Sequence, residues 1–258
     1  MSFAKIYTRG LLGLHAPLIE VEVHVSAGLP SLTIVGLAEA AVRESKDRVR
    51  SAIINSGYQF PTKRLTINLA PADLPKDGSR LDLPIALGIL IATGQLPENV
   101  TDEFEFIGEL ALDGHLRPVT GTLTIAMACQ SAKHQLMLPK ENADEAAQLP
   151  EFQVFAAGHL KQVCEHFLSS KKIDATISKK AEQSSYYKFD LEDVKGQLRP
   201  RRALEIAAAG GHSILFKGPP GTGKTLLASR LPSILPALNS QENLEVASIY
   251  SVANAQHH

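Results

Sequence analysis

The sequence predicts an α/β protein in two parts, and three observations indicate that fold class. Strand-like and helical runs alternate through residues 1–168, which is typical of an α/β domain. Residues 169–189 are rich in Lys and Ser and lack apolar periodicity, as a linker does. Residues 190–258 contain a glycine-rich turn between an apolar run and a helical run. We therefore expect a first domain at 1–168, a basic linker at 169–189 and part of a second domain at 190–258.

The first domain is predicted to alternate strands with helices along the chain. Apolar runs that alternate or are rich in β-branched residues predict strands at residues 19–25, 32–35, 65–69, 104–111, 135–138 and 153–156. Apolar residues at helical spacing, or good capping residues, predict helices at residues 38–56, 82–93, 122–133, 142–148 and 159–168. The helix at 82–93 is almost entirely apolar, so we expect it to be buried and Asp82 to cap it.

The composition is that of a soluble globular protein, with 44% hydrophobic and 21% charged residues among 258. The N-terminal residues lack the apolar core of a signal peptide, and no later run reaches membrane-spanning length. A cytoplasmic protein without a membrane partner is therefore expected. Cys129 and Cys164 lie far apart without CxxC spacing, so we expect two small buried residues rather than a disulfide or a zinc site.

Charge is distributed unevenly along the chain. Residues 1–168 carry 14 Lys and Arg against 19 Asp and Glu, whereas residues 169–217 carry 10 against 6. The acidic first domain is a poor candidate for nonspecific DNA binding, which usually needs a basic face. The basic surplus around the linker is either a solvated connector or a contact for DNA phosphates.

The turn in the second part has the GxxxxGK[ST] spacing of a P-loop, within the segment SILFKGPPGTGKT at residues 213–225. An apolar run at 213–216 predicts a strand before the turn, and residues 226–231 predict a helix after it. The predicted nucleotide contacts are Gly218, Pro219, Pro220, Gly221, Thr222, Gly223, Lys224 and Thr225. Backbone amides would face the phosphates, Lys224 would reach the β- and γ-phosphates, and the Thr225 hydroxyl would bind Mg²⁺. We expect the ligand to be ATP with Mg²⁺; the alternative is a glycine-rich structural turn.

The residues around this turn resemble a known family. Residues 190–225, DLEDVKGQLRPRRALEIAAAGGHSILFKGPPGTGKT, look like the start of the AAA+ module in the magnesium-chelatase-like YifB/ComM family. The resemblance implies that the Val-x-Gly-Gln stretch lies beside the adenine, with Gly196 and Gln197 as contacts of the base. A helix-entry turn is the alternative for these two residues.

Nucleotide hydrolysis needs a carboxylate at the end of an apolar strand and a basic finger. The acids after Thr225 are Glu242 and Glu245, and neither follows an apolar strand run. We expect the chain to end before the AAA+ module is complete and not to hydrolyse ATP by itself. His257 and His258 are either native or the remnant of a tag, and a metal site would need further ligands.

The first 168 residues resemble the N-terminal domain of the same family, which is similar to the proteolytic domain of Lon proteases. Two segments carry this likeness, APADLPKDGSRLDLPIAL at 70–87 and IGELALDGHLRPVTG at 107–121. The likeness implies a ribosomal-protein-S5 domain-2-like α/β fold. The Lon nucleophile position is Arg80 here and the Lon lysine position is Leu123, so the serine nucleophile and its lysine base are both replaced.

Polar residues near this segment allow two further interpretations. Ser79 with Lys76 is a displaced serine–lysine pair, or else two solvated loop residues. Asp77 with Asp82 is a carboxylate pair for acid–base chemistry, or else a turn residue and a helix cap. The histidines show no HExxH spacing, so they predict no metal site.

The resemblance implies that the intact protein is an oligomeric AAA+ ATPase, a hexameric ring. ComM-type members are implied to be DNA helicases that drive branch migration during natural transformation, so DNA is the implied partner. The alternatives are an ATPase associated with a protease, a magnesium-chelatase motor acting on a tetrapyrrole, and a non-catalytic ATP-binding assembly module. The replacements at Arg80 and Leu123 argue against the protease.

Overall fold

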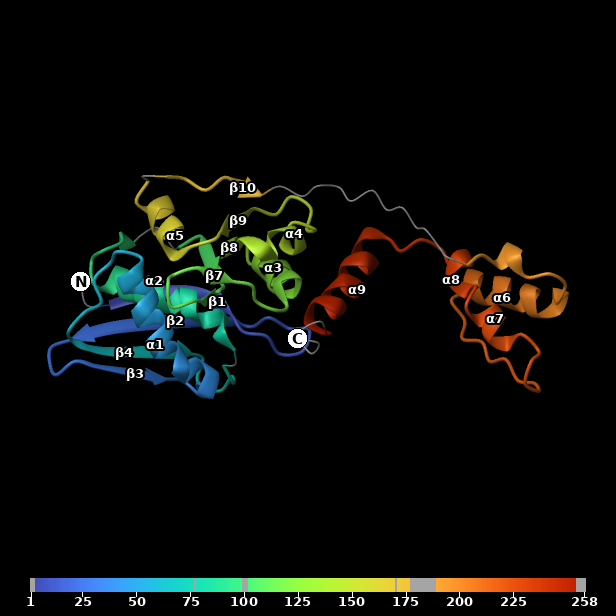
Figure 1. Cartoon of the computed structure of the whole chain (residues 1–258), viewed down its shortest axis with the longest axis horizontal. Helices are drawn as coiled ribbons and strands as arrows, with labels where there is room; N and C mark the ends of the chain where they lie inside the picture. Colours follow the sequence, from blue (N-terminus) through green and yellow to red (C-terminus); the bar gives the residue numbers. More distant parts are fainter. Residues whose placement is uncertain (1–2, 77, 99–101, 170, 177–188, 254–258) are drawn as a thin grey trace. The chain divides into compact units, whose positions relative to one another are not determined.

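The chain divides into two compact units, residues 1–180 with 244–258 and residues 181–243 (Figure 1). The computed structural model describes residues 3–76, 78–98, 102–169, 171–176 and 189–253. The predicted second part extends from 190 to 258, whereas residues 244–253 group with the first unit.

A mixed β-sheet forms the centre of the first unit. Its strands are β1 (Phe3–Arg9), β2 (Leu18–Ser26), β3 (Ser31–Val35), β4 (Arg64–Ala70), β5 (Phe104–Phe106), β8 (Gln135–Pro139), β9 (Val154–Ala157) and β10 (Ala175–Thr176). The order across the eight described strands is β10-β9-β8-β5-β1-β2-β4-β3. Strands β9, β8, β5 and β1 are parallel to one another, and β2 is antiparallel to both β1 and β4. With its helices, this sheet confirms the predicted α/β class.

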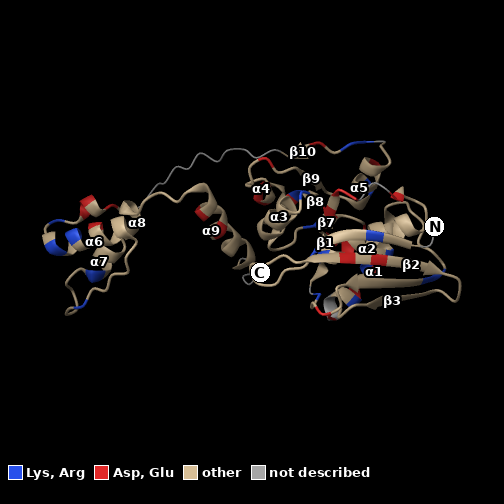
Figure 2. Ribbon diagram, turned by 180° about the vertical axis from the view of Figure 1, so that it is seen from behind, with Lys and Arg blue, Asp and Glu red and all other residues tan. Residues whose placement is uncertain are grey.

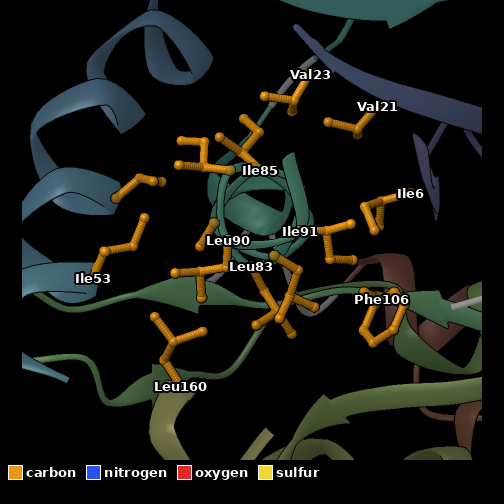
Figure 3. Packing of buried hydrophobic residues seen from close by; sticks show 14 of the residues in the cluster. Ile6, Val21, Val23, Ile53, Leu83, Ile85, Leu90, Ile91, Phe106 and Leu160 are labelled. Atoms are coloured by element: carbon orange, nitrogen blue, oxygen red, sulfur yellow. The ribbon is translucent and has the colours of Figure 1, made fainter. Parts of the chain in front are cut away.

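Helix α2 (Asp82–Ala92) is the centre of the main hydrophobic core. All eleven of its residues are buried, as its apolar sequence predicts. Figure 3 shows its side chains among residues from strands and helices: Ile6, Val21, Val23, Ile53, Phe106 and Leu160. Each Leu or Ile removed from water in this way contributes about 1.5–3 kcal/mol of stability.

The other helices of the first unit cover both faces of the sheet. They are α1 (Ala40–Asn55), α3 (Thr122–Ser131), α4 (Ala143–Ala146) and α5 (Leu160–Phe167). Side chains of β8 alternate between two cores, because Met137 belongs to the cluster around α2, and Leu136 and Leu138 belong to the cluster formed with α3 and α4. Helices therefore pack on both sides of this part of the sheet, as parallel strands require.

Three features of the sheet differ from the sequence prediction. One is that β10 (Ala175–Thr176) lies within the predicted linker 169–189. The predicted strand at 104–111 is divided, because β5 ends at Phe106 and a short hairpin of β6 (Glu109–Leu110) with β7 (Leu116–Arg117) follows. Between them Gly108 leaves the sheet: its N–H donates to the Arg80 carbonyl, and its own carbonyl accepts from the N–H of Leu83. Strand β1 was not predicted. In the structure its side chains alternate between buried and more exposed positions, as in a half-buried strand.

The second unit is small and mainly helical in its described residues. Its elements are a 3₁₀ turn (Leu191–Asp193), α6 (Leu198–Gly210), α7 (Lys224–Ala228) and α8 (Leu231–Ile234), followed by α9 (Ser240–Ala253), which continues into residues of the first unit. Its core consists of Leu191, Val194, Leu204 and Leu227. No helix in the described part of the chain has the length and hydropathy needed to cross a bilayer.

The predicted strand at 213–216 is wrong, since these residues form no strand in the structure. Ile214 and Phe216 pack on the core, whereas Leu215 between them is 88% exposed. The side chains therefore keep the alternation of a strand, but no strand lies beside them among the described residues to complete a ladder of backbone hydrogen bonds. The predicted helix at 226–231 is also interrupted, between α7 and α8.

Candidate functional site

The P-loop residues wrap around the ammonium group of Lys224. Its Nζ donates to the carbonyl of Gly218 at 2.9 Å and to the carbonyl of Pro219 at 2.7 Å. The Thr222 hydroxyl also donates to the Pro219 carbonyl, at 2.9 Å, and so closes the loop on itself. Lys224 is the first residue of α7, whose Leu227 is buried in the small core and anchors the helix. The loop thus presents a positive charge at its centre.

Two glycines give the loop its shape. Gly221 and Gly223 both have φ near 80°, in the left-handed region where a side chain is strained. A Cβ atom at Gly223 would also lie 2.8 Å from Nε2 of Gln197. The loop conformation therefore requires glycine at these positions, in agreement with the conformation that the motif predicts.

Gln197 approaches this loop from the start of α6. Its Nε2 lies 3.4 Å from the carbonyl oxygen of Thr222 and donates to it. Gly196 and Gln197 have φ values of 71° and 49°, so the chain makes a left-handed turn directly before the helix. The structure thus brings together the loop and the Val-x-Gly-Gln stretch. The helix-entry turn is therefore present, and the Gln197 side chain reaches the P-loop, whereas a contact of these residues with the base stays a prediction.

The donors around the loop fit a nucleotide with its metal ion. Lys224 supplies a cation, the glycine-rich backbone supplies amides, and Thr225 is exposed in the first turn of α7. Within the described residues, no group of three or more His, Cys, Asp or Glu side chains is placed to hold a metal ion. The Thr225 hydroxyl is of the kind that could ligate Mg²⁺ beside phosphate oxygens.

The two positions that correspond to the Lon catalytic pair are structural in this chain. Arg80 is 8% exposed and lies in a 3₁₀ turn (Ser79–Leu81). Leu123 is 1% exposed and belongs to the apolar cluster of α3 and α4. A guanidinium and a hydrocarbon chain supply neither a hydroxyl nucleophile nor an amine base.

The displaced pair of Ser79 and Lys76 is not formed. The Ser79 hydroxyl donates to the carboxylate of Glu109, which also accepts from Arg117 at 3.3 Å. Lys76 is 1% exposed and its ammonium donates to the carbonyl of Pro71. Burial lowers the pKa of Lys76, but its partner is a carbonyl and not the serine. The serine therefore faces a carboxylate that sequence reasoning did not assign to it.

Comparison with known proteins decides the family. Residues 21–142 match the model of subunit ChlI of Mg-chelatase, and residues 190–258 match the model of magnesium chelatase, subunit ChlI. The uncharacterized protein YifB of Escherichia coli is 49% identical over 261 residues, which cover 99% of this chain and 50% of the relative. The competence protein ComM of Haemophilus influenzae is 46% identical over 256 residues, covering 98% and 50%. The chain belongs to the magnesium-chelatase-like YifB/ComM family.

The chain spans about half the length of the curated relatives it matches. The likeness of this YifB/ComM-family chain to Lon is partial. Lon protease 1 of Thermus thermophilus is 33% identical over 88 residues, which cover 34% of this chain and 11% of the relative. This match supports a partial resemblance to Lon proteases without extending it to the whole chain.

Asp82 has a role in this YifB/ComM-family chain that the sequence did not predict. Its carboxylate is fully buried and bound by Arg48, with Nε 2.7 Å from Oδ2 and Nη2 3.1 Å from Oδ1. The N–H of Leu110 also donates to Oδ2, at 3.2 Å. The predicted cap is wrong, because the Asp82 carboxylate binds Arg48 and makes no capping hydrogen bond at the start of the helix. Burial raises the pKa of Asp82 to about 6, although Arg48 acts to lower it. Asp77 lies outside the described residues.

The cysteines are buried and free, as predicted. Burial raises the pKa of the Cys164 thiol to about 12 and also raises the pKa of Cys129. Neither thiol is therefore a reactive thiolate near neutral pH. His257 and His258 lie outside the described residues.

Proposed function

We propose that this chain is the nucleotide-binding part of a magnesium-chelatase-like ATPase and that it binds ATP with Mg²⁺ at residues 218–225. The observation that carries the proposal is the loop closed around Lys224, with Nζ 2.9 Å from the Gly218 carbonyl and 2.7 Å from the Pro219 carbonyl. A triphosphate would replace these carbonyls as the partner of the ammonium, because a charge-assisted hydrogen bond to phosphate is stronger. Thr225 would hold Mg²⁺.

Gly196 and Gln197 are proposed to contact the base. The support for this role is the approach of the Gln197 amide to the P-loop, 3.4 Å from the Thr222 carbonyl. An amide that carries both a donor and an acceptor suits the edge of a purine. The phosphates and the base would then be held by two segments of the same unit.

Hydrolysis is proposed to need residues that correspond to the half of the curated relatives that this chain does not cover. Among the described residues after Thr225, the carboxylates are Glu242 and Glu245, and both lie on helix α9. A helix surface does not place a carboxylate at the end of a strand beside the γ-phosphate, where metal and water must be oriented. The chain as given would therefore bind ATP without turning it over.

For the intact protein we propose a homo-oligomeric AAA+ motor, a hexameric ring that acts on DNA as a helicase in branch migration during natural transformation. The similarity to a relative named competence protein ComM supports the proposed role in natural transformation. The family models, which describe a subunit of magnesium chelatase, favour a chelatase-type motor as the second candidate. In both cases the first unit would be a degenerate Lon-like domain with the ribosomal-protein-S5 domain-2-like fold, at residues 1–168, joined by the linker 169–189 to an AAA+ portion at 190–258.

Titration of a fluorescent ATP analogue tests the binding proposal. The Lys224→Ala variant removes the ammonium, and we expect affinity to fall by about tenfold or more, since hydrogen bonds to charged groups contribute about 1.5–3 kcal/mol. The matched control is Lys217→Ala, which removes the same charge from an exposed residue just before the loop. Chelation of Mg²⁺ should weaken binding to the wild type. Equal affinity of both variants and the wild type would remove Lys224 from the proposed site.

A further inference from the structure

A pocket lies in the first unit, far along the chain from the P-loop. It has a volume of about 380 Å³ and lies where β8 and β9 end, at Pro139 and Ala157. Lys140 directly follows β8, and His159 precedes α5, which follows β9. These strands are parallel neighbours, so their carboxyl ends share one edge of the sheet. Such an edge is the usual place for ligands in α/β sheets, and the volume is within the range of small-molecule sites.

Positive charge gathers around this pocket. Its lining includes Lys140, Lys171 and Lys172 but a single carboxylate, Glu165, which lies 3.9 Å from the ammonium of Lys161. Within the described residues, no ion pair is formed by the three lining lysines. Elsewhere in the first unit acidic and basic residues are interspersed, as Figure 2 shows. The three lining lysines and Glu165 together carry a charge of about +2.

One wall of the pocket is held rigidly by hydrogen bonds. Nε2 of His159 donates to the carbonyl of Asp113 at 3.1 Å, and its Nδ1 accepts from the N–H of Lys161 at 3.1 Å. These two contacts fix the orientation of the His159 ring. The ring of His115 packs against it edge-on at 4.8 Å, and Nδ1 of His115 lies 3.1 Å from the Asp113 carboxylate.

A side-chain amide adds a donor to this wall. Oε1 of Gln162 accepts from the N–H of Gly158 at 2.8 Å, which fixes the orientation of the amide. Its NH₂ group forms no hydrogen bond within the described residues and so remains a donor beside the lysines. Three ammonium groups and one amide donor together match the oxygens of a compact anion with about two negative charges.

We propose that this pocket binds a small phosphate monoester. Such a group carries a charge of about −1.5 to −2 near pH 7, which balances the excess charge of the lining. Residues 1–180, which include Lys171 and Lys172, carry 20 acids against 18 bases, so distant phosphates of a long polyanion would also meet carboxylates. A compact phosphate meets only the nearby ammonium groups. The site is independent of the P-loop and of the proposed function.

Binding of phenyl phosphate in the Lys224→Ala background tests this proposal, because that variant removes the proposed P-loop contact. Calorimetry would measure affinity, and amide NMR shifts at Gly158 and Gln162 would report the location. We expect the double variant Lys171→Gln/Lys172→Gln and the single variant Lys140→Gln each to weaken binding by about tenfold or more, because each removes a charge-assisted hydrogen bond to the phosphate.

The matched control is Lys63→Gln/Lys133→Gln, which removes two charges from exposed lysines outside the pocket. Far-UV circular dichroism would show that all variants are folded. Unchanged affinity in the control, with shifts at Gly158 and Gln162, would support the site. Equal weakening by the control, or no binding of phenyl phosphate to the parent, would overturn it. Tighter binding of a single-stranded oligonucleotide that depends on the same lysines would also overturn it, in favour of a nucleic-acid surface.

Discussion

The buried ion pair between Arg48 and Asp82 offers a prediction whose size follows from the structure. Asp82 is fully buried at the start of α2, while the Arg48 side chain is 23% exposed. Replacing Arg48 with Met keeps the apolar stem and leaves the carboxylate without its charged partner. Loss of one member of a buried pair costs about 3–5 kcal/mol. We therefore expect Arg48→Met to lower the free energy of unfolding of the first unit by about this amount at pH 8.

The loss should shrink as the pH falls. In the wild type burial raises the pKa of Asp82 from 3.8 to about 6, so the folded state takes up a proton more readily than the unfolded state. The contribution of Asp82 to the free energy of unfolding is therefore most favourable below pH 4, and it becomes less favourable as the pH rises to about 6. That difference is about 3 kcal/mol, at about 1.4 kcal/mol for each tenfold change in proton affinity. Without Arg48 the pKa of Asp82 rises further. The pH range over which Asp82 lowers the stability then extends above pH 6.

Urea unfolding at pH 5 and pH 8, followed by circular dichroism, measures both effects, and hydrogen exchange of the α2 amides would assign them to the first unit. The control is Arg43→Met, on the same helix, where an exposed arginine donates to the Ala38 carbonyl and not to a buried carboxylate. A loss for Arg48→Met that is the same at both pH values, or no larger than that of the control, would refute the reasoning.

Three further predictions concern the base contact of Gln197, the Lon-like segment at Ser79, and binding to DNA. Gln197→Ala should lower ATP affinity about fivefold, for about 1 kcal/mol of lost hydrogen bonding, and leave the affinity for inorganic tripolyphosphate unchanged; equal effects on both ligands would contradict a contact with the base. Casein incubated with the intact protein and ATP should stay uncleaved, with or without Ser79→Ala, and cleavage that Ser79→Ala abolishes would restore the protease alternative. Fluorescence anisotropy should show the intact protein binding DNA about tenfold more tightly than this chain, in a salt-dependent way; tight binding by the acidic residues 1–168 would contradict the charge argument.

Local patterns predicted much of the first unit. The buried helix at 82–93 followed from the ten consecutive apolar residues at 83–92, and the strands at 19–25 and 65–69 from their alternation. The strand at 213–216 shows the limit of such patterns. Its side chains alternate as in a strand, but a strand exists only through a ladder with a neighbour, and none of the described residues supplies one.

The sequence by itself determined the P-loop, because its glycines, Lys224 and Thr225 lie within eight residues and their spacing dictates the local turn. It also determined that Arg80 and Leu123 cannot act as the Lon pair, since side-chain chemistry alone excludes it. Only the tertiary structure decided the partners of the buried polar groups. Asp82 binds an arginine 34 residues away, and Ser79 binds a carboxylate 30 residues away. The physical reason is that a buried charge takes whichever partner the packing of strands and helices brings within reach, and sequence spacing carries no record of that distance.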